Sequence, residues 1–169
     1  MKRLFFAYWP DDIARQHCVK VVQALQKGKA RTVKPNNLHV TLLFLGSVSA
    51  DKEMALRQAA ATIPIPSSSL CFDRLSFWKK PGVICLTTST LNPDVKDLVE
   101  HLTTITKALD IPIEERPYQP HVTLLRNSKA MAAIDFQPII WRSNSFCLVQ
   151  SHSVLNNVEY KVLQTWESH

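Results

Sequence analysis

The chain has 169 residues, 46% of them hydrophobic and 20% charged, a composition and length that suit one globular domain with a hydrophobic core. The formal net charge of +6 favours a polyanionic partner such as RNA. The three glycines form neither a P-loop nor a dinucleotide-binding fingerprint, and no apolar stretch approaches transmembrane length, so these two binding motifs and a membrane span are excluded.

Strand and helix patterns alternate in the first half of the chain. Apolar residues at helical spacing follow Asp11 and Asp12, either of which can cap a helix that Gly28 can end. The elements expected here are a strand at 3–9, a helix from Asp11 or Asp12 to about Lys27, a strand at 38–45, and a helix from Ser49 or Asp51 to about Thr62.

The second half of the chain is expected to hold strands around one helix. Asn92 and Pro93 suit the cap and the first turn of that helix, and the prolines between residues 111 and 120 predict a loop. The expected elements are strands at 69–78 and 83–88, a helix from Asn92, a loop at 111–120, a strand at 121–126, a linker at 128–133, and strands at 135–141, 145–152 and 158–166. Strands and helices mixed in this way predict an α+β fold.

The tetrapeptide His-Val-Thr-Leu occurs twice, at residues 39–42 and again at 121–124. Because strand side chains alternate between faces, the histidine and threonine of each copy share one face. Strict alternation puts Phe44 on the opposite face from His39, and Arg126 on the opposite face from His121. Two such strands facing one another would place two imidazoles and two hydroxyls around one cleft.

This set of side chains suits phosphate-ester chemistry. One imidazole can act as a base and the other as an acid near neutral pH, and the hydroxyls can donate hydrogen bonds to phosphate oxygens. About half of the chain separates the two copies, which fits a single two-lobed domain over residues 1–169 with one motif strand in each lobe. A single copy would more often be structural, but a structural role gives no reason for the same threonine at the same offset twice.

The chain resembles the two-histidine phosphoesterases, and within them the RNA 2′,3′-cyclic phosphodiesterases, also called 2′-5′ RNA ligases. Besides the two motifs, the resemblance covers most of the chain. The matching segments are Arg3–Ala7, Asn36–Leu38, Phe44–Gly46, Arg116–Tyr118 with Pro120, Arg126, and the closing Tyr160 and Trp166.

The resemblance implies a two-lobed α+β fold in which antiparallel sheets from both lobes face a central cleft, with helices outside. It also implies that water opens a 2′,3′-cyclic phosphate at an RNA end to leave a 2′-phosphate, with ligation as the reverse reaction. We assign His121 as base and His39 as acid, with Thr41 and Thr123 binding the phosphate, although two nearly identical motifs do not decide which histidine is which. No cofactor or metal is expected, because neither motif contains a carboxylate.

Three further residues are candidates for substrate binding. Arg126 could bind the phosphate if the strand bulges or twists, and a solvated surface arginine is the alternative. Tyr118 could stack on a base or pack within its loop. Ser151 could line the site or be a polar residue of a strand.

The sequence leaves open a related enzyme for a small cyclic phosphate or a 2′-5′ linkage, and an RNA-binding module with a vestigial site. The four cysteines are far apart and form no C-x-x-C pair, which favours free thiols in a reducing compartment. Pro10 cuts the first apolar run before it reaches the length of a signal peptide. We therefore expect a cytoplasmic protein, with a monomer as the default and no association with a membrane.

Overall fold

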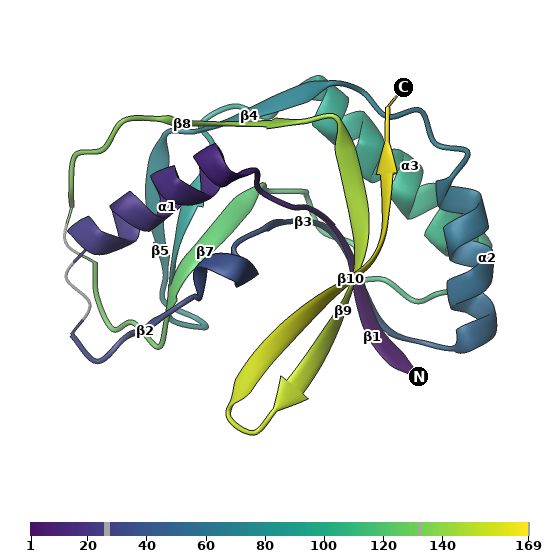
Figure 1. Cartoon of the computed structure of the whole chain (residues 1–169), viewed down its shortest axis with the longest axis horizontal. Coiled ribbons are helices and arrows are strands. Elements are labelled where there is room, and N and C mark those ends of the chain that lie inside the picture. The colour runs from purple at the N-terminus through teal and green to yellow at the C-terminus, as the bar shows by residue number, and fades with distance from the viewer. Residues whose placement is uncertain (26–27, 132, 169) are drawn as a thin grey trace.

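The structure is a computed structural model that describes residues 1–25, 28–131 and 133–168. Strands and helices are mixed along the chain, as Figure 1 shows. The elements are β1 (Lys2–Tyr8), α1 (Asp12–Ala24), β2 (Arg31–Thr32), the 3₁₀ helix η1 (Pro35–Asn37), β3 (Val40–Val48), α2 (Ala50–Ala60), β4 (Ser68–Phe72), β5 (Arg74–Trp78), β6 (Val83–Thr87), α3 (Pro93–Ala108), β7 (His121–Arg126), β8 (Ile139–Ser143), β9 (Ser145–Val154) and β10 (Asn157–Glu167).

The strands form two antiparallel sheets of four strands, and each sheet contains one copy of the motif. The first sheet has the order β10-β9-β1-β3 and holds the first motif on β3. The second has the order β2-β7-β6-β5 and holds the second motif on β7. A two-stranded ribbon of β4 and β8 runs along one edge of the molecule (Figure 1). This arrangement confirms the expected α+β fold with antiparallel sheets from both lobes.

The helices begin where the sequence provides a capping side chain. Asp11, Ser49 and Asn92 each accept a hydrogen bond from a backbone N–H in the first turn of α1, α2 and α3. Helix α1 packs against β7 and β8, whereas α3 packs against α2 and β3. Helices α1 and α3 therefore each pack on one of the sheets, α2 packs on α3, and the apolar side chains of both sheets join in one continuous core.

Two of the expected strands are wrong in extent. Residues 69–78 form β4 and β5, which belong to different sheets, instead of one strand. The break falls at Asp73, whose carboxylate accepts hydrogen bonds from the backbone N–H and the hydroxyl of Ser89. The strand expected at 135–141 begins only at Ile139, where β8 starts to pair with Phe72 of β4.

Smaller differences concern the ends of α1 and the segment after it. Helix α1 ends at Ala24 instead of near Lys27, which lies outside the described residues. The short strand β2 and the helix η1 were not expected, because two or three residues are too few to show a period. The expected loop at 111–120 has no regular structure. Among the described residues, no helix has the length and apolar character needed to cross a membrane.

Candidate active site

A β-bulge in β7 decides which side chains share a face with the second motif. Along the pairing with β6, Cys85 lies opposite Thr123 and Ile84 lies opposite Leu125, so Leu124 is one extra residue in β7. Leu124 and Leu125 are consequently both buried. The bulge resets the alternation, so Arg126 projects from the same face as His121 and Thr123. Strict alternation predicts Arg126 on the face opposite His121, and this prediction is wrong.

Strand β3 contains similar irregularities. Ala7 lies opposite Thr41 and Phe6 opposite Leu43, which makes Leu42 an extra residue. Phe44, opposite Phe5, then shares a face with Thr41, and its side chain is 46% exposed. The expectation that Phe44 lies on the face opposite His39 and Thr41 is therefore wrong, for the same reason as in β7.

Both motif histidines are held by the same kind of backbone contact. The Nδ1 atom of His39 lies 2.7 Å from the carbonyl oxygen of Asn37, and that of His121 lies 3.0 Å from the carbonyl oxygen of Gln119. A carbonyl can only accept, so each ring carries its hydrogen on Nδ1 when neutral. Each Nε2 is then free to take or give a proton. In His39 this atom also lies 3.1 Å from the hydroxyl oxygen of Thr41.

Aromatic rings surround His39 much more closely than His121. Trp9 stacks on the His39 ring at 5.3 Å between centroids and 8° between planes. Phe5 and Tyr160 each lie 5.0 Å from the same ring. His121 has an edge-on contact with Trp78 at 4.8 Å. These rings limit the rotation of both imidazoles and keep water away from most of His39.

The environment lowers the pKa of both histidines. Burial is the main cause for His39 and, with the positive charges of His121 and Arg126, lowers its pKa to about 4, against the opposing effect of the Asn37 carbonyl. Burial also lowers the pKa of His121, and the charges of Arg116 and Arg126 act in the same direction. The charge of Arg126 thus acts on both imidazoles, and that of His121 acts on His39. Strands β3 and β7 also contact one another, so the two motifs lie near each other.

Comparison with known proteins identifies the family. The sequence model described as LigT like Phosphoesterase matches residues 12–85, which contain the first motif. Over 168 residues, the chain is 30% identical to the RNA 2′,3′-cyclic phosphodiesterase of Escherichia coli (strain K12), covering 98% of this chain and 96% of that one. The chain belongs to the LigT-like phosphoesterase family. The resemblance expected from the two motifs is confirmed.

Solved structures of this phosphoesterase family agree with the fold. The structure of E. coli LigT in apo form superposes with a TM-score of 0.88 at 29% identity, covering 98% of this chain and 96% of that chain. The structure of E. coli LigT complexed with 3′-AMP superposes with a TM-score of 0.86 at 29% identity, covering 98% and 97%. Both comparisons span the two lobes and therefore both motif strands.

Tyr118 connects the two motif strands of this phosphoesterase. Its hydroxyl donates a hydrogen bond of 2.9 Å to the backbone carbonyl oxygen of Thr41, and burial is the main cause that raises its pKa. A partly buried ring packed against the core, with its hydroxyl engaged by Thr41, favours the packing role over stacking on a base. We expect Tyr118→Phe to lower the free energy of unfolding by about 1 kcal/mol, because the partly buried carbonyl of Thr41 loses its donor.

Urea denaturation measures this effect of Tyr118. Tyr160→Phe is the matched control, since Tyr160 contacts His39 through its ring and the substitution keeps the ring. Equal stability of Tyr118→Phe and the wild-type protein would show that the hydrogen bond to Thr41 contributes nothing.

Ser151 lies on the same face of the first sheet as the aromatic rings around His39. It is opposite Arg3 in β1 and opposite Tyr160 in β10. The structure thus places Ser151 beside Tyr160, on the side of the sheet that holds the first motif. Sequence analysis missed the contacts of Trp9 and Trp78 with the histidines. Ala7 lies opposite Thr41 on the motif face, and strand alternation places Trp9, two residues further along, on the same face; this alternation was the available signal.

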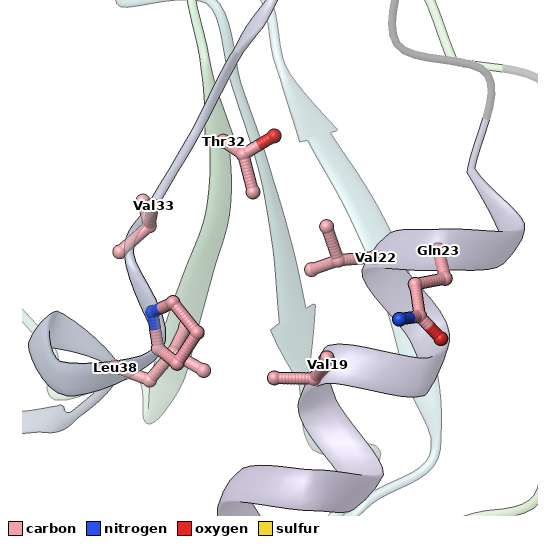
Figure 2. A pocket seen from close by; sticks show the side chains of 7 residues that line it. Val19, Val22, Gln23, Thr32, Val33 and Leu38 are labelled. Atoms are coloured by element: carbon pink, nitrogen blue, oxygen red, sulfur yellow. The ribbon is translucent and has the colours of Figure 1, made fainter.

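An apolar pocket of about 250 Å³ lies apart from the histidines, between α1, β2 and η1 (Figure 2). Val19 and Val22 of α1 face Thr32 and Leu38 across it. Its lining contains no titratable side chain and neither motif histidine. Within the described ranges, no group of three or more His, Cys, Asp or Glu residues is placed to hold a metal ion.

Proposed function

We infer that this protein hydrolyses a 2′,3′-cyclic phosphate at an RNA end to a 2′-phosphate. The observation that carries this inference is the matched hydrogen bonding of two histidines, each with Nδ1 on a backbone carbonyl, on the two contacting motif strands with Arg126 nearby. The E. coli relative carries the name of this activity, and E. coli LigT has been seen complexed with 3′-AMP, a nucleotide with a phosphate on the ribose.

The reaction is an in-line displacement at phosphorus. Nε2 of His121 takes a proton from the attacking water, whose oxygen forms a new bond to phosphorus. The bond between phosphorus and the ribose 3′-oxygen breaks, and protonated His39 gives its Nε2 proton to that oxygen. Each proton transfer of this kind accelerates the reaction by about 10²–10⁴-fold.

The surroundings of His39 act on its role as acid in two opposite directions, because burial lowers its pKa to about 4 whereas the aromatic rings and the bound phosphate favour its protonated form. A cation within about 6 Å of an aromatic centroid is stabilised by the ring, and Trp9, Phe5 and Tyr160 all meet this condition at His39. The negative charge of a bound cyclic phosphate raises the pKa of a nearby imidazole, and so opposes the lowering by burial. His121 is the less buried histidine, which suits the group that meets the attacking water.

The other site residues bind or position the phosphate in this proposal. The hydroxyls of Thr41 and Thr123 and the guanidinium of Arg126 donate hydrogen bonds to its non-bridging oxygens as charge moves onto them. Tyr118 positions Thr41 through a hydrogen bond to the Thr41 carbonyl. Ser151 lies beside Tyr160, one of the aromatic residues around His39. No metal or cofactor takes part in these steps. One chain supplies every group, so we propose that a monomer acts, in a reducing compartment such as the cytoplasm.

The test uses the purified protein, excess chelator and an oligoribonucleotide that ends in a 2′,3′-cyclic phosphate. We expect opening to a 2′-phosphate, identified by mass spectrometry and phosphorus NMR, at the same rate with and without chelator. A 3′-phosphate product would contradict the regiochemistry. Loss of activity in chelator would favour a metal site instead.

The lowered histidine pKa values predict the pH dependence. In the free protein both imidazoles lose their proton below pH 6.5, so the alkaline limb of kcat/KM should fall below that pH. The bound phosphate raises both pKa values, so the bell-shaped curve of kcat should lie at higher pH. Steady-state rates from pH 4 to 9 measure both curves. A kcat/KM that keeps rising above pH 8 would contradict the need for a protonated histidine.

A further inference from the structure

Two arginines lie directly opposite one another at the edge of the second sheet. In the pairing of β2 with β7, Arg31 is the partner of Arg126, and Thr32 is the partner of Leu125. Paired residues of an antiparallel ladder point to the same face, with Cβ atoms about 4.5–5.5 Å apart. Leu125 is buried, and Thr32 lines the pocket beneath α1 (Figure 2). Arg31 therefore projects from the opposite face, together with Arg126 and the second motif.

The positive charges of Arg31 and Arg126 repel one another, and no carboxylate of the described residues neutralises them. Like charges directly opposite in a sheet destabilise it. Among the described residues, neither Arg31 nor Arg126 forms a salt bridge with a carboxylate. Anions bound at the two guanidinium groups would remove this repulsion, and arginine binds phosphate groups in two-point fashion.

The Arg31 side chain is also held in place. One of its terminal nitrogens, Nη2, donates to the backbone oxygen of Asn156 at 3.2 Å and to Oδ1 of Asn157 at 3.0 Å. These two residues form the tip of the β9–β10 hairpin, which belongs to the other sheet. The contact uses one nitrogen and leaves Nη1 and Nε for a ligand. The hairpin thus fixes Arg31 at the end of the site without neutralising it.

We propose that Arg31 binds the internucleotide phosphate that precedes the cyclic phosphate, and so selects RNA ends over cyclic mononucleotides. The proposal rests on the proposed function, in which Arg126 and the histidines take the cyclic phosphate itself. The internucleotide phosphate lies one nucleotide away from the cyclic phosphate along the RNA. Arg31 lies beside Arg126 on the neighbouring strand of the sheet. A cyclic mononucleotide has no second phosphate and gains nothing from Arg31.

The test compares two substrates, an oligoribonucleotide with a 2′,3′-cyclic phosphate end and 2′,3′-cyclic AMP. We expect Arg31→Gln to lower the ratio of their kcat/KM values, oligonucleotide to mononucleotide, by about tenfold, the effect of losing one charged phosphate contact. The slope of log kcat/KM against log salt for the oligonucleotide should become shallower by about 1. Arg142→Gln, at an exposed position on β8, is the matched control and should leave the ratio unchanged.

Asn157→Ala separates phosphate binding from a role in holding the hairpin. It removes one hydrogen bond of Arg31 but keeps the charge, so the ratio should stay within about twofold of the wild-type value. An unchanged ratio in Arg31→Gln would overturn the inference while leaving the proposed function intact. Equal losses in Asn157→Ala and Arg31→Gln would also overturn it, in favour of a positioning role. A wild-type protein that opens neither substrate would overturn the proposed function, and the inference with it.

Discussion

His39→Ala and His121→Ala should each lower kcat for opening of the cyclic phosphate by about 10³-fold or more, because each removes one of the two proton transfers. The two groups act as a unit, so the double variant should lose little more than either single variant. Single-turnover rates on the cyclic-phosphate oligonucleotide measure the chemical step directly. His17→Ala, at an exposed position on α1, is the control and should keep the wild-type rate.

The loss must be separated from damage to the fold. His39→Asn and His121→Asn keep a side-chain N–H that can donate to the Asn37 or Gln119 carbonyl, but they have no group that titrates near neutral pH. We expect these variants to melt near the wild-type temperature and to be as inactive as the alanine variants. Near wild-type turnover in either pair of variants would show that the two-histidine mechanism is wrong.

The repeated motif allowed much of the site to be predicted, because alternation along a strand correctly joins each histidine to its threonine. The same rule fails beyond the motif. Phe44 and Arg126 both lie on the motif face because an extra residue, Leu42 or Leu124, interrupts the alternation. A bulge adds one residue without changing the apolar composition, so two adjacent buried leucines look alike in a regular strand and in a bulged one.

Other features depend on contacts between distant segments, which a local pattern does not contain. Between β4 and β5, Asp73 accepts a hydrogen bond from Ser89, which lies 16 residues later in the chain. Trp9 and Tyr160 come from opposite ends of the chain, and both contact the His39 ring. The carbonyls that hold the two histidines come from residues two positions earlier, but their direction depends on the backbone entering each strand. The sequence therefore predicts which groups react, whereas tertiary structure sets the tautomer and pKa of the two histidines.

Arg126→Gln should lower kcat/KM by about 10²-fold for oligonucleotide and mononucleotide substrates alike, because it removes a charged donor to the phosphate that reacts. Arg126→Lys should recover part of this loss, since it keeps the charge but not the two-point geometry. The equal effect on both substrates distinguishes Arg126 from Arg31. Arg142→Gln is again the matched control on the outer ribbon.

A second measurement on Arg126→Gln does not depend on substrate. The positive charge of Arg126 lowers the pKa of both His39 and His121, so its removal should raise both values in the free protein. NMR titration of the imidazole C–H resonances measures this shift, and the alkaline limb of kcat/KM should move to higher pH with it. Unchanged pKa values and unchanged activity would mean that Arg126 points away from the histidines. Because the bulge at Leu124 sets the direction of Arg126, that result would also contradict the register of β7 against β6.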